Sequence, residues 1–90
     1  MQSLEKNGYE NASLIRVIEV RAMKDYRLWL RFSTGEEKWF DFTPLLSYPA
    51  FKPLADPRQF NNVSLDHGAT IWNGGEIDIN PSYLYNNAIK

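Results

Sequence analysis

The sequence predicts an α+β fold: a small single domain of antiparallel strands, two hairpins plus an N-terminal strand, with short proline-initiated helical turns and a C-terminal helix. Residues 26–32, YRLWLRF, alternate apolar and polar side chains, as a half-buried strand does. Gly35 and Gly68 each end a tight turn between two strand-like segments. At three places a capping residue precedes a proline, which is the typical start of a helix. We expect a flexible N-terminal arm over residues 1–12 and a single α+β domain over residues 13–90.

Length and composition limit the classes of function. Ninety residues suffice for one small domain, and 43% hydrophobic with 14% aromatic residues is typical of an ordered globular chain. The net charge of −1 argues against a protein that binds nucleic acid mainly through charge. The sequence has no cysteine, which excludes disulfides and thiolate chemistry. It also has no apolar run long enough to cross a membrane and no apolar core of a secretion signal near its start. We therefore expect a cytoplasmic protein without membrane contact.

A stretch rich in β-branched residues, residues 14–22, predicts the first strand. Its apolar side chains fall on both parities, because Ile15 and Val17 share one face while Ile18 and Val20 share the other. The strand is therefore either buried on both sides at its start or interrupted by a β-bulge.

The register of the first hairpin follows from its turn and its side chains. A three-residue loop, Ser33–Gly35 with Gly35 in the left-handed conformation, is expected to join the strands at residues 26–32 and 36–42. On the face that points away from the core, this loop places opposite charges across from each other, which stabilises a pair by roughly 0.2–1 kcal/mol. The predicted pairs on that face are Arg31 with Glu37, Trp29 with Trp39, and Arg27 with Asp41. On the inner face only Lys38, opposite Leu30, is out of place, and we expect its stem to cover apolar surface while its amine reaches water.

A proline-rich stretch separates the two halves of the chain. Thr43-Pro44 and Asp56-Pro57 each place an N-cap residue before a proline at the first helical position. Pro49 and Pro53 prevent one long helix, so we expect only short helical turns between residues 44 and 60. This stretch is predicted to be a crossover from the first hairpin to the second.

The second hairpin is predicted from residues 62–66 and 69–72. We expect a three-residue loop, Asp66–Gly68, to join the two strands. The expected pairs are Leu65 with Ala69 and Val63 with Ile71 on the inner face, and Ser64 with Thr70 on the outer face.

The chain is expected to end in a short extended piece and a helix. Ile77 and Ile79 alternate with polar residues, as in a short strand. Asn80-Pro81 repeats the cap-plus-proline pattern and predicts a helix that packs through Tyr83, Leu84 and Ala88.

Three stretches together resemble a known bacterial family. They are YRLWLRFSTGEEKWFDFTPLL, FKPLADPRQFNNVSLD and TIWNGGEIDINPSYLY, and over residues 14–85 their order is similar to that of the small family called domain of unknown function 2442. The resemblance implies a compact α+β domain of antiparallel strands and short helices. Some relatives carry a helix-turn-helix after this domain, and some are encoded beside another small domain as toxin–antitoxin pairs are. Because this sequence stops at Lys90, shortly after the domain, we do not expect it to bind DNA in that way.

The candidate site is an aromatic patch on the sheet. Alternation places Trp29 and Trp39 on the face away from the apolar pairs, where they are covered by a helix, by the N-terminal arm or by a partner. An aromatic centre inside a charged rim is typical of binding surfaces. The candidate interaction residues are Arg27, Trp29, Arg31, Glu37, Trp39 and Asp41. We therefore interpret the chain as a non-enzymatic protein-interaction module, regulatory or antitoxin-like as the resemblance implies, that binds a protein partner or a second copy of itself.

Two other functions are weighed against this one. The alternative is a nucleic-acid-binding accessory domain that uses Trp29 and Trp39 with Arg27 and Arg31. The third is a small enzyme or metal-binding domain centred on His67, the only histidine. His67 lies in a turn, and the acidic residues match no calcium loop. The segment at residues 73–76 lacks the pattern of a phosphate-binding loop. We expect no enzyme activity, no cofactor and no metal.

Overall fold

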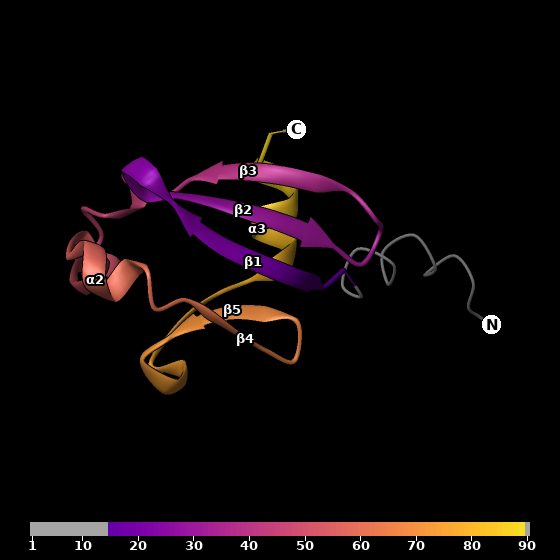
Figure 1. Ribbon diagram of the computed structural model, residues 1–90. Coiled ribbons are helices and arrows are strands. Elements are labelled where there is room, and N and C mark those ends of the chain that lie inside the picture. Colours follow the sequence, from indigo (N-terminus) through magenta and orange to yellow (C-terminus); the bar gives the residue numbers. More distant parts are fainter. Residues whose placement is uncertain (1–14, 90) are drawn as a thin grey trace.

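Two three-stranded antiparallel sheets make up most of the fold, as a computed structural model that describes residues 15–89 shows (Figure 1). The N-terminal arm expected over residues 1–12 lies outside the described residues. Sheet A contains, in order, β1 (Val17–Met23), β2 (Arg27–Phe32) and β3 (Glu37–Asp41). Sheet B contains, in order, β4 (Ser64–Asp66), β5 (Ala69–Trp72) and β6 (Ile77–Ile79).

Short helical segments connect the strands. They are η1 (Lys24–Tyr26), η2 (Thr43–Leu45), η3 (Pro49–Ala55), α2 (Pro57–Phe60) and η4 (Asn73–Gly75), and α3 (Pro81–Asn87) follows the last strand. In Figure 1, α3 lies behind sheet A, sheet B lies alongside β1, and the crossover with α2 lies at one end of sheet A. This arrangement confirms the predicted α+β fold with antiparallel hairpins, short helical turns and a C-terminal helix.

The predicted register of the first hairpin is confirmed. β2 and β3 pair with Trp29 opposite Trp39, and Gly35 has a φ of 93°, which only glycine adopts readily. The register of β1 against β2 shifts between Val17 and Glu19, which places a β-bulge there. The bulge explains why the apolar residues of the first strand fall on both parities: Val17 is buried before it, and Ile18 is exposed within it.

The predicted register of the second hairpin is wrong. Asp66 pairs with Ala69 and Leu65 pairs with Thr70, so the turn has two residues, His67 and Gly68, instead of three. Both turn residues have positive φ, 53° and 85°, as in the tight hairpin turns whose twist matches that of the strands. The shift turns Thr70 inward, in contrast to the outward position that we predicted, and its exposed fraction is 0%.

Two of the three predicted helix caps are confirmed. The side chains of Asp56 and Asn80 accept hydrogen bonds from the backbone N–H groups of Arg58 and Ser82. Thr43 is not a cap, because Phe42 already has helical angles and Thr43 is the first residue inside η2. The N–H of Thr43 instead donates to the Asp41 carboxylate at 2.9 Å.

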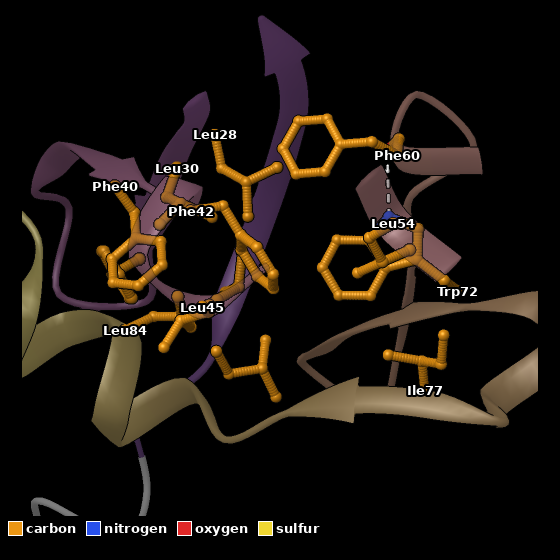
Figure 2. Close-up of a cluster of buried hydrophobic side chains, with 13 residues drawn as sticks. Leu28, Leu30, Phe40, Phe42, Leu45, Leu54, Phe60, Trp72, Ile77 and Leu84 are labelled. Carbon is orange, nitrogen blue, oxygen red and sulfur yellow. Dashed lines mark hydrogen bonds between the residues drawn. The ribbon is translucent and has the colours of Figure 1, made fainter. Parts of the chain in front are cut away.

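An aromatic cluster forms the centre of the core, between sheet A, the crossover and sheet B (Figure 2). The ring of Phe42 makes edge contacts with Phe51, Phe60 and Trp72 at centroid distances of 5.3, 5.7 and 5.4 Å. The indole N–H of the buried Trp72 donates to the Phe60 carbonyl oxygen at 2.9 Å, drawn as a dashed line in Figure 2. The cluster therefore joins the crossover to both sheets.

Helix α3 packs on the inner face of sheet A. Leu84 is buried, and Tyr85 makes an edge contact with Phe32 at a centroid distance of 5.1 Å. The amine of Lys38 donates to the Tyr85 carbonyl oxygen at 2.9 Å and lies 3.8 Å from the centre of the Tyr85 ring. The Lys38 amine that we expected in water therefore binds α3. The Tyr85 hydroxyl donates to the Glu36 carboxylate, and this hydrogen bond raises the pKa of Tyr85 above its ordinary value.

Replacing Trp72 with phenylalanine is expected to destabilise the protein by about 2 kcal/mol, because a buried hydrogen bond is lost and a cavity is left. The unfolding free energy measured by urea denaturation checks this. Trp39→Phe is the matched control. We expect it to lower the free energy of unfolding by less than about 1 kcal/mol, because Trp39 lies on the outer face of sheet A, away from the core. Equal losses in the two variants would contradict the role of the Trp72 hydrogen bond.

Replacing Thr70 with valine is expected to stabilise the protein. The Thr70 hydroxyl is buried and has no hydrogen-bond partner among residues 15–89. Removing it relieves a desolvation cost of about 1 kcal/mol. Thermal and urea unfolding of Thr70→Val, beside Thr43→Val at an exposed position, measures the effect. A less stable Thr70→Val protein would mean that the hydroxyl has a partner in solution.

Candidate interaction surface

The outward side chains of sheet A form a three-by-three array. Each strand of the sheet contributes three residues, and the registers of the two strand pairs align them in rows. The rows are Glu19–Arg31–Glu37, Arg21–Trp29–Trp39 and Met23–Arg27–Asp41. We call these nine residues the tryptophan face. All six candidate residues from the sequence lie on it, and the structure therefore brings them together.

The two tryptophans are half-buried, and arginines of the same face lie against them. The guanidinium groups of Arg21 and Arg31 each lie 5.7 Å from the centre of the Trp29 ring, and that of Arg27 lies 5.3 Å from the Trp39 ring. Such cation–π contacts contribute about 0.5–1 kcal/mol at exposed sites. Trp29 is therefore held between two cations instead of lying free on the sheet.

Ion pairs connect the three residues of the row Glu19–Arg31–Glu37. Arg31 lies 3.5 Å from the Glu19 carboxylate and 3.7 Å from the Glu37 carboxylate, and Arg21 lies 3.0 Å from Glu19. Exposed pairs of this kind stabilise the fold little. The predicted pairing of Arg31 with Glu37 is confirmed as an ion pair.

Arg27 and Asp41 are opposite each other as predicted, but no ion pair joins them. Asp41 accepts a hydrogen bond from the backbone of Thr43, and the Nε of Arg27 donates to the Lys24 carbonyl oxygen at 3.4 Å. The Asp41 carboxylate, which we predicted to pair with Arg27 across the strands, therefore binds the backbone of the turn after β3 instead.

The C-terminal segment extends the central row. The backbone of Ile89 pairs with that of Trp39 in both directions, at 2.6 and 2.8 Å. Directly opposed residues of antiparallel strands project to the same face, so Ile89 continues the row beyond Trp39. Its side chain is 71% exposed. The apolar centre of the surface is therefore Trp29, Trp39 and Ile89.

Sequence reasoning missed four residues of this surface: Glu19, Arg21, Met23 and Ile89. The first three lie on β1, whose face could not be assigned without knowing where the bulge falls. The only signal was the change of apolar parity near Ile18. The pairing of Ile89 joins segments 50 residues apart, and no local pattern predicts such a contact.

Among residues 15–89, no element packs over the tryptophan face. Helix α3 contacts the inner face through Phe40 and Phe32, and Figure 1 places it on that side of sheet A alone. Among the described residues, the cover over the two tryptophans therefore comes from neighbours in the same face. Cover by the N-terminal arm, the other possibility in the sequence, lies outside the described residues.

His67 lies apart from this surface. Its side chain is 94% exposed at the tip of the second hairpin, and its Nδ1 lies 2.8 Å from the Asp66 carboxylate. A pocket of about 290 Å³ beside it is lined by Arg16, Val17, Ile18, His67 and Gly68, and no carboxylate lines it. Within the described part of the chain, no group of three or more histidine, cysteine or acidic side chains gathers at one point. The same residues include no helix long and apolar enough to cross a membrane.

Comparisons with known proteins agree with this fold. The structure is similar to the crystal structure of a putative DNA binding protein from Nitrosomonas europaea, with a TM-score of 0.64 and 28% sequence identity. The match covers 80% of this chain and 48% of that one, so this chain spans about half the length of that protein. A search of the curated proteins finds no match. A family model described as protein of unknown function (DUF2442) matches residues 17–90. The resemblance seen in the sequence is thereby confirmed, and the chain belongs to the DUF2442 family.

Proposed function

We propose that this chain is a non-enzymatic protein-interaction module that binds a protein partner on the tryptophan face. The observation that carries the proposal is the pair of adjacent tryptophans at the centre of a sheet face over which no element of residues 15–89 packs. Large aromatic side chains at the centre of a charged rim contribute most of the binding free energy in many interfaces. The regulatory or antitoxin-like role implied by the family resemblance would be exercised through this face.

The arrangement of the face favours a preorganised interface. Ion pairs hold Arg31 between Glu19 and Glu37, and two guanidinium groups hold Trp29. A partner therefore meets side chains that already contact one another, and each such contact reduces the freedom that is lost on binding. Exposed Ile89 adds apolar area beside Trp39.

The charge pattern favours a different protein over a second copy. When two sheets pack face to face, their strands align within about 30°. In a symmetric dimer, a two-fold axis that passes by Trp29 and runs parallel to the strands places Arg31 of one copy opposite Arg31 of the other. An axis that runs perpendicular to the strands places Arg31 of one copy opposite Arg27 of the other. Like charges that meet in an interface weaken binding. We therefore propose a heterologous partner with its own mixture of charges.

The test is partner capture by full-length protein, followed by measurement of the dissociation constant with the purified partner. We expect Trp29→Ala and Trp39→Ala each to weaken binding at least about tenfold, because interface tryptophans are frequent hot spots. Arg58→Ala, at an exposed position away from the face, is the control and should bind as the wild type does.

Circular dichroism separates loss of binding from loss of folding. If both tryptophan variants unfold, Arg31→Glu provides a second test, because it reverses a charge in the rim and leaves the aromatic centre in place. Unchanged affinity in folded variants would overturn the proposal. Light scattering adds a further check: we expect a monomer in the absence of partner, and a dimer abolished by Trp39→Ala would replace the heterologous partner with a second copy.

Nucleic-acid binding is the second candidate, favoured by the description of the Nitrosomonas europaea protein and by the three arginines of the face. Two observations place it second. Arg31 is already paired with carboxylates, and the face carries as many acidic as basic side chains. The guanidinium contacts also occupy the tryptophan rings on which bases would stack.

Fluorescence anisotropy with labelled single-stranded and duplex DNA at low salt distinguishes the two candidates. We expect no binding, since a face without surplus positive charge releases few counterions from the phosphates. Salt-sensitive binding that is lost in Arg27→Gln or Arg31→Gln would make nucleic acid the ligand of the tryptophan face. Arg58→Gln is the matched control.

A further inference from the structure

Strand β3 forms one edge of sheet A, and the end of α3 leads to that edge (Figure 1). Both backbone groups of Trp39 are directed away from β2, because its N–H and C=O bond Ile89. These directions alternate along an antiparallel strand, so Glu37 and Asp41 also direct their backbone groups outward. Among residues 15–89, Ile89 is the one residue whose backbone bonds this edge. The edge therefore offers two further residues to a chain that pairs with it.

The segment at Ala88 and Ile89 is attached lightly to this edge. Two backbone hydrogen bonds, of 2.6 and 2.8 Å, join Ile89 to Trp39, and the Ile89 side chain is exposed. Ala88 is partly buried, but its methyl group buries little apolar area. Helix α3 is held separately, since the amine of Lys38 donates to the Tyr85 carbonyl oxygen. Ile89 can therefore leave the edge while α3 stays in place.

The side chains at this edge are acidic on both sides of Trp39. Glu37 and Asp41 are exposed, and with Trp39 they form the outermost column of the tryptophan face. The neighbouring column, on β2, has an arginine on each side of Trp29. An acidic–aromatic–acidic strand therefore already pairs with a basic–aromatic–basic one. A strand with basic residues on both sides of an apolar one complements β3 on its open side too, since opposite charges across strands stabilise pairing.

We propose that the outer edge of β3 is a strand-addition site for an extended segment of the protein partner. Ile89 shows what the site accepts: an extended backbone antiparallel to β3, with a β-branched apolar side chain opposite Trp39. The partner's segment displaces Ile89 and continues the pairing to Glu37 and Asp41, with a basic residue opposite each. Its outward side chains extend the tryptophan face, because directly opposed residues project to the same side. This inference rests on the proposed function and specifies the chemistry of the partner.

Hydrogen exchange tests whether Ile89 leaves the edge. Among residues 15–89 the Trp39 N–H donates to Ile89, whereas the Phe40 N–H is directed to β2. We expect the Trp39 amide of the full-length protein to exchange at least about a hundredfold faster than the Phe40 amide, after correction for their intrinsic rates. Equal protection of the two amides would make Ile89 a fixed part of the sheet and overturn the proposal.

The probe for strand addition is the peptide acetyl-Gly-Arg-Thr-Ile-Thr-Arg-Gly-amide, titrated into the full-length ¹⁵N-labelled protein and followed by NMR. We expect saturable shifts at the amides of Glu37, Trp39 and Asp41, with a dissociation constant in the millimolar range. The same peptide with an N-methylated isoleucine lacks the N–H that donates to the Trp39 carbonyl oxygen. It should bind at least about tenfold more weakly, and so should the peptide with glutamate in place of both arginines.

Variants test the displaced segment and the charge separately. Ile89→Pro removes the N–H that donates to the Trp39 carbonyl oxygen and leaves β3 unchanged. We expect it to bind the arginine peptide about threefold to tenfold more tightly, because the peptide no longer competes with Ile89. Glu37→Gln should weaken binding about threefold. Glu76→Gln, at an exposed position before β6, is the matched control and should bind as the wild type does.

Partner capture separates this proposal from the one on which it rests. If Trp29→Ala weakens partner binding while the peptide does not bind, the tryptophan face remains the interface and strand addition is overturned. If the peptide binds while both tryptophan variants keep their affinity for the partner, the proposed function is overturned and the strand-addition site stands. A dimer that Ile89→Pro abolishes would assign the edge to a second copy, and shifts confined to residues away from β3 would likewise overturn the proposal.

Discussion

The packing of aromatic rings around Phe42 is the interaction on which the rest of the structure depends. Phe42 is the residue directly after β3, and its ring contacts Phe51 and Phe60 from the crossover and Trp72 from sheet B. Proline prevents the crossover from forming a long helix, so its backbone hydrogen bonds belong to short turns and join residues that are close together in the sequence. The aromatic rings and the Trp72 hydrogen bond to the Phe60 carbonyl attach these turns to the rest of the fold. The large buried side chains of sheet A all lie on the inner face of the sheet, where this cluster and helix α3 pack.

The side chains on the outer face of sheet A are those that the core leaves out. Because the core occupies the inner face, Trp29 and Trp39 project outward, and within residues 15–89 only neighbours on the same face cover them. Arginines lie over the rings, and acidic residues lie within ion-pair distance of one of those arginines. The balance of charge on this aromatic surface is the reason that we propose a protein partner in place of a phosphate backbone.

Much of the candidate surface could be predicted from the sequence, for a local reason. A glycine at the end of a three-residue loop set the register of β2 and β3, and complementary charges agreed with that register at Arg31 and Glu37. The part that could not be predicted depends on contacts between distant segments. The bulge in β1 decides that Arg21 joins Trp29, and the C-terminal segment brings Ile89 to Trp39. The change of apolar parity near Ile18 allowed a bulge without fixing its place, and the pairing of Ile89 has no local signal, since both are set by how one segment meets another across the sheet.

By itself, the sequence determined the fold class, the first hairpin with its paired tryptophans, and the caps at Asp56 and Asn80, because turn residues, alternation and capping act within a few positions of the chain. Only the tertiary structure decided the register of the second hairpin. There, side-chain pattern favoured an outward Thr70, but Trp72 lies in the aromatic cluster beside Phe42, and residues two apart on a strand share a face. The burial of one large indole in the core therefore turned Thr70 inward with its hydroxyl unpaired among residues 15–89, at a cost that no pattern within the hairpin reveals.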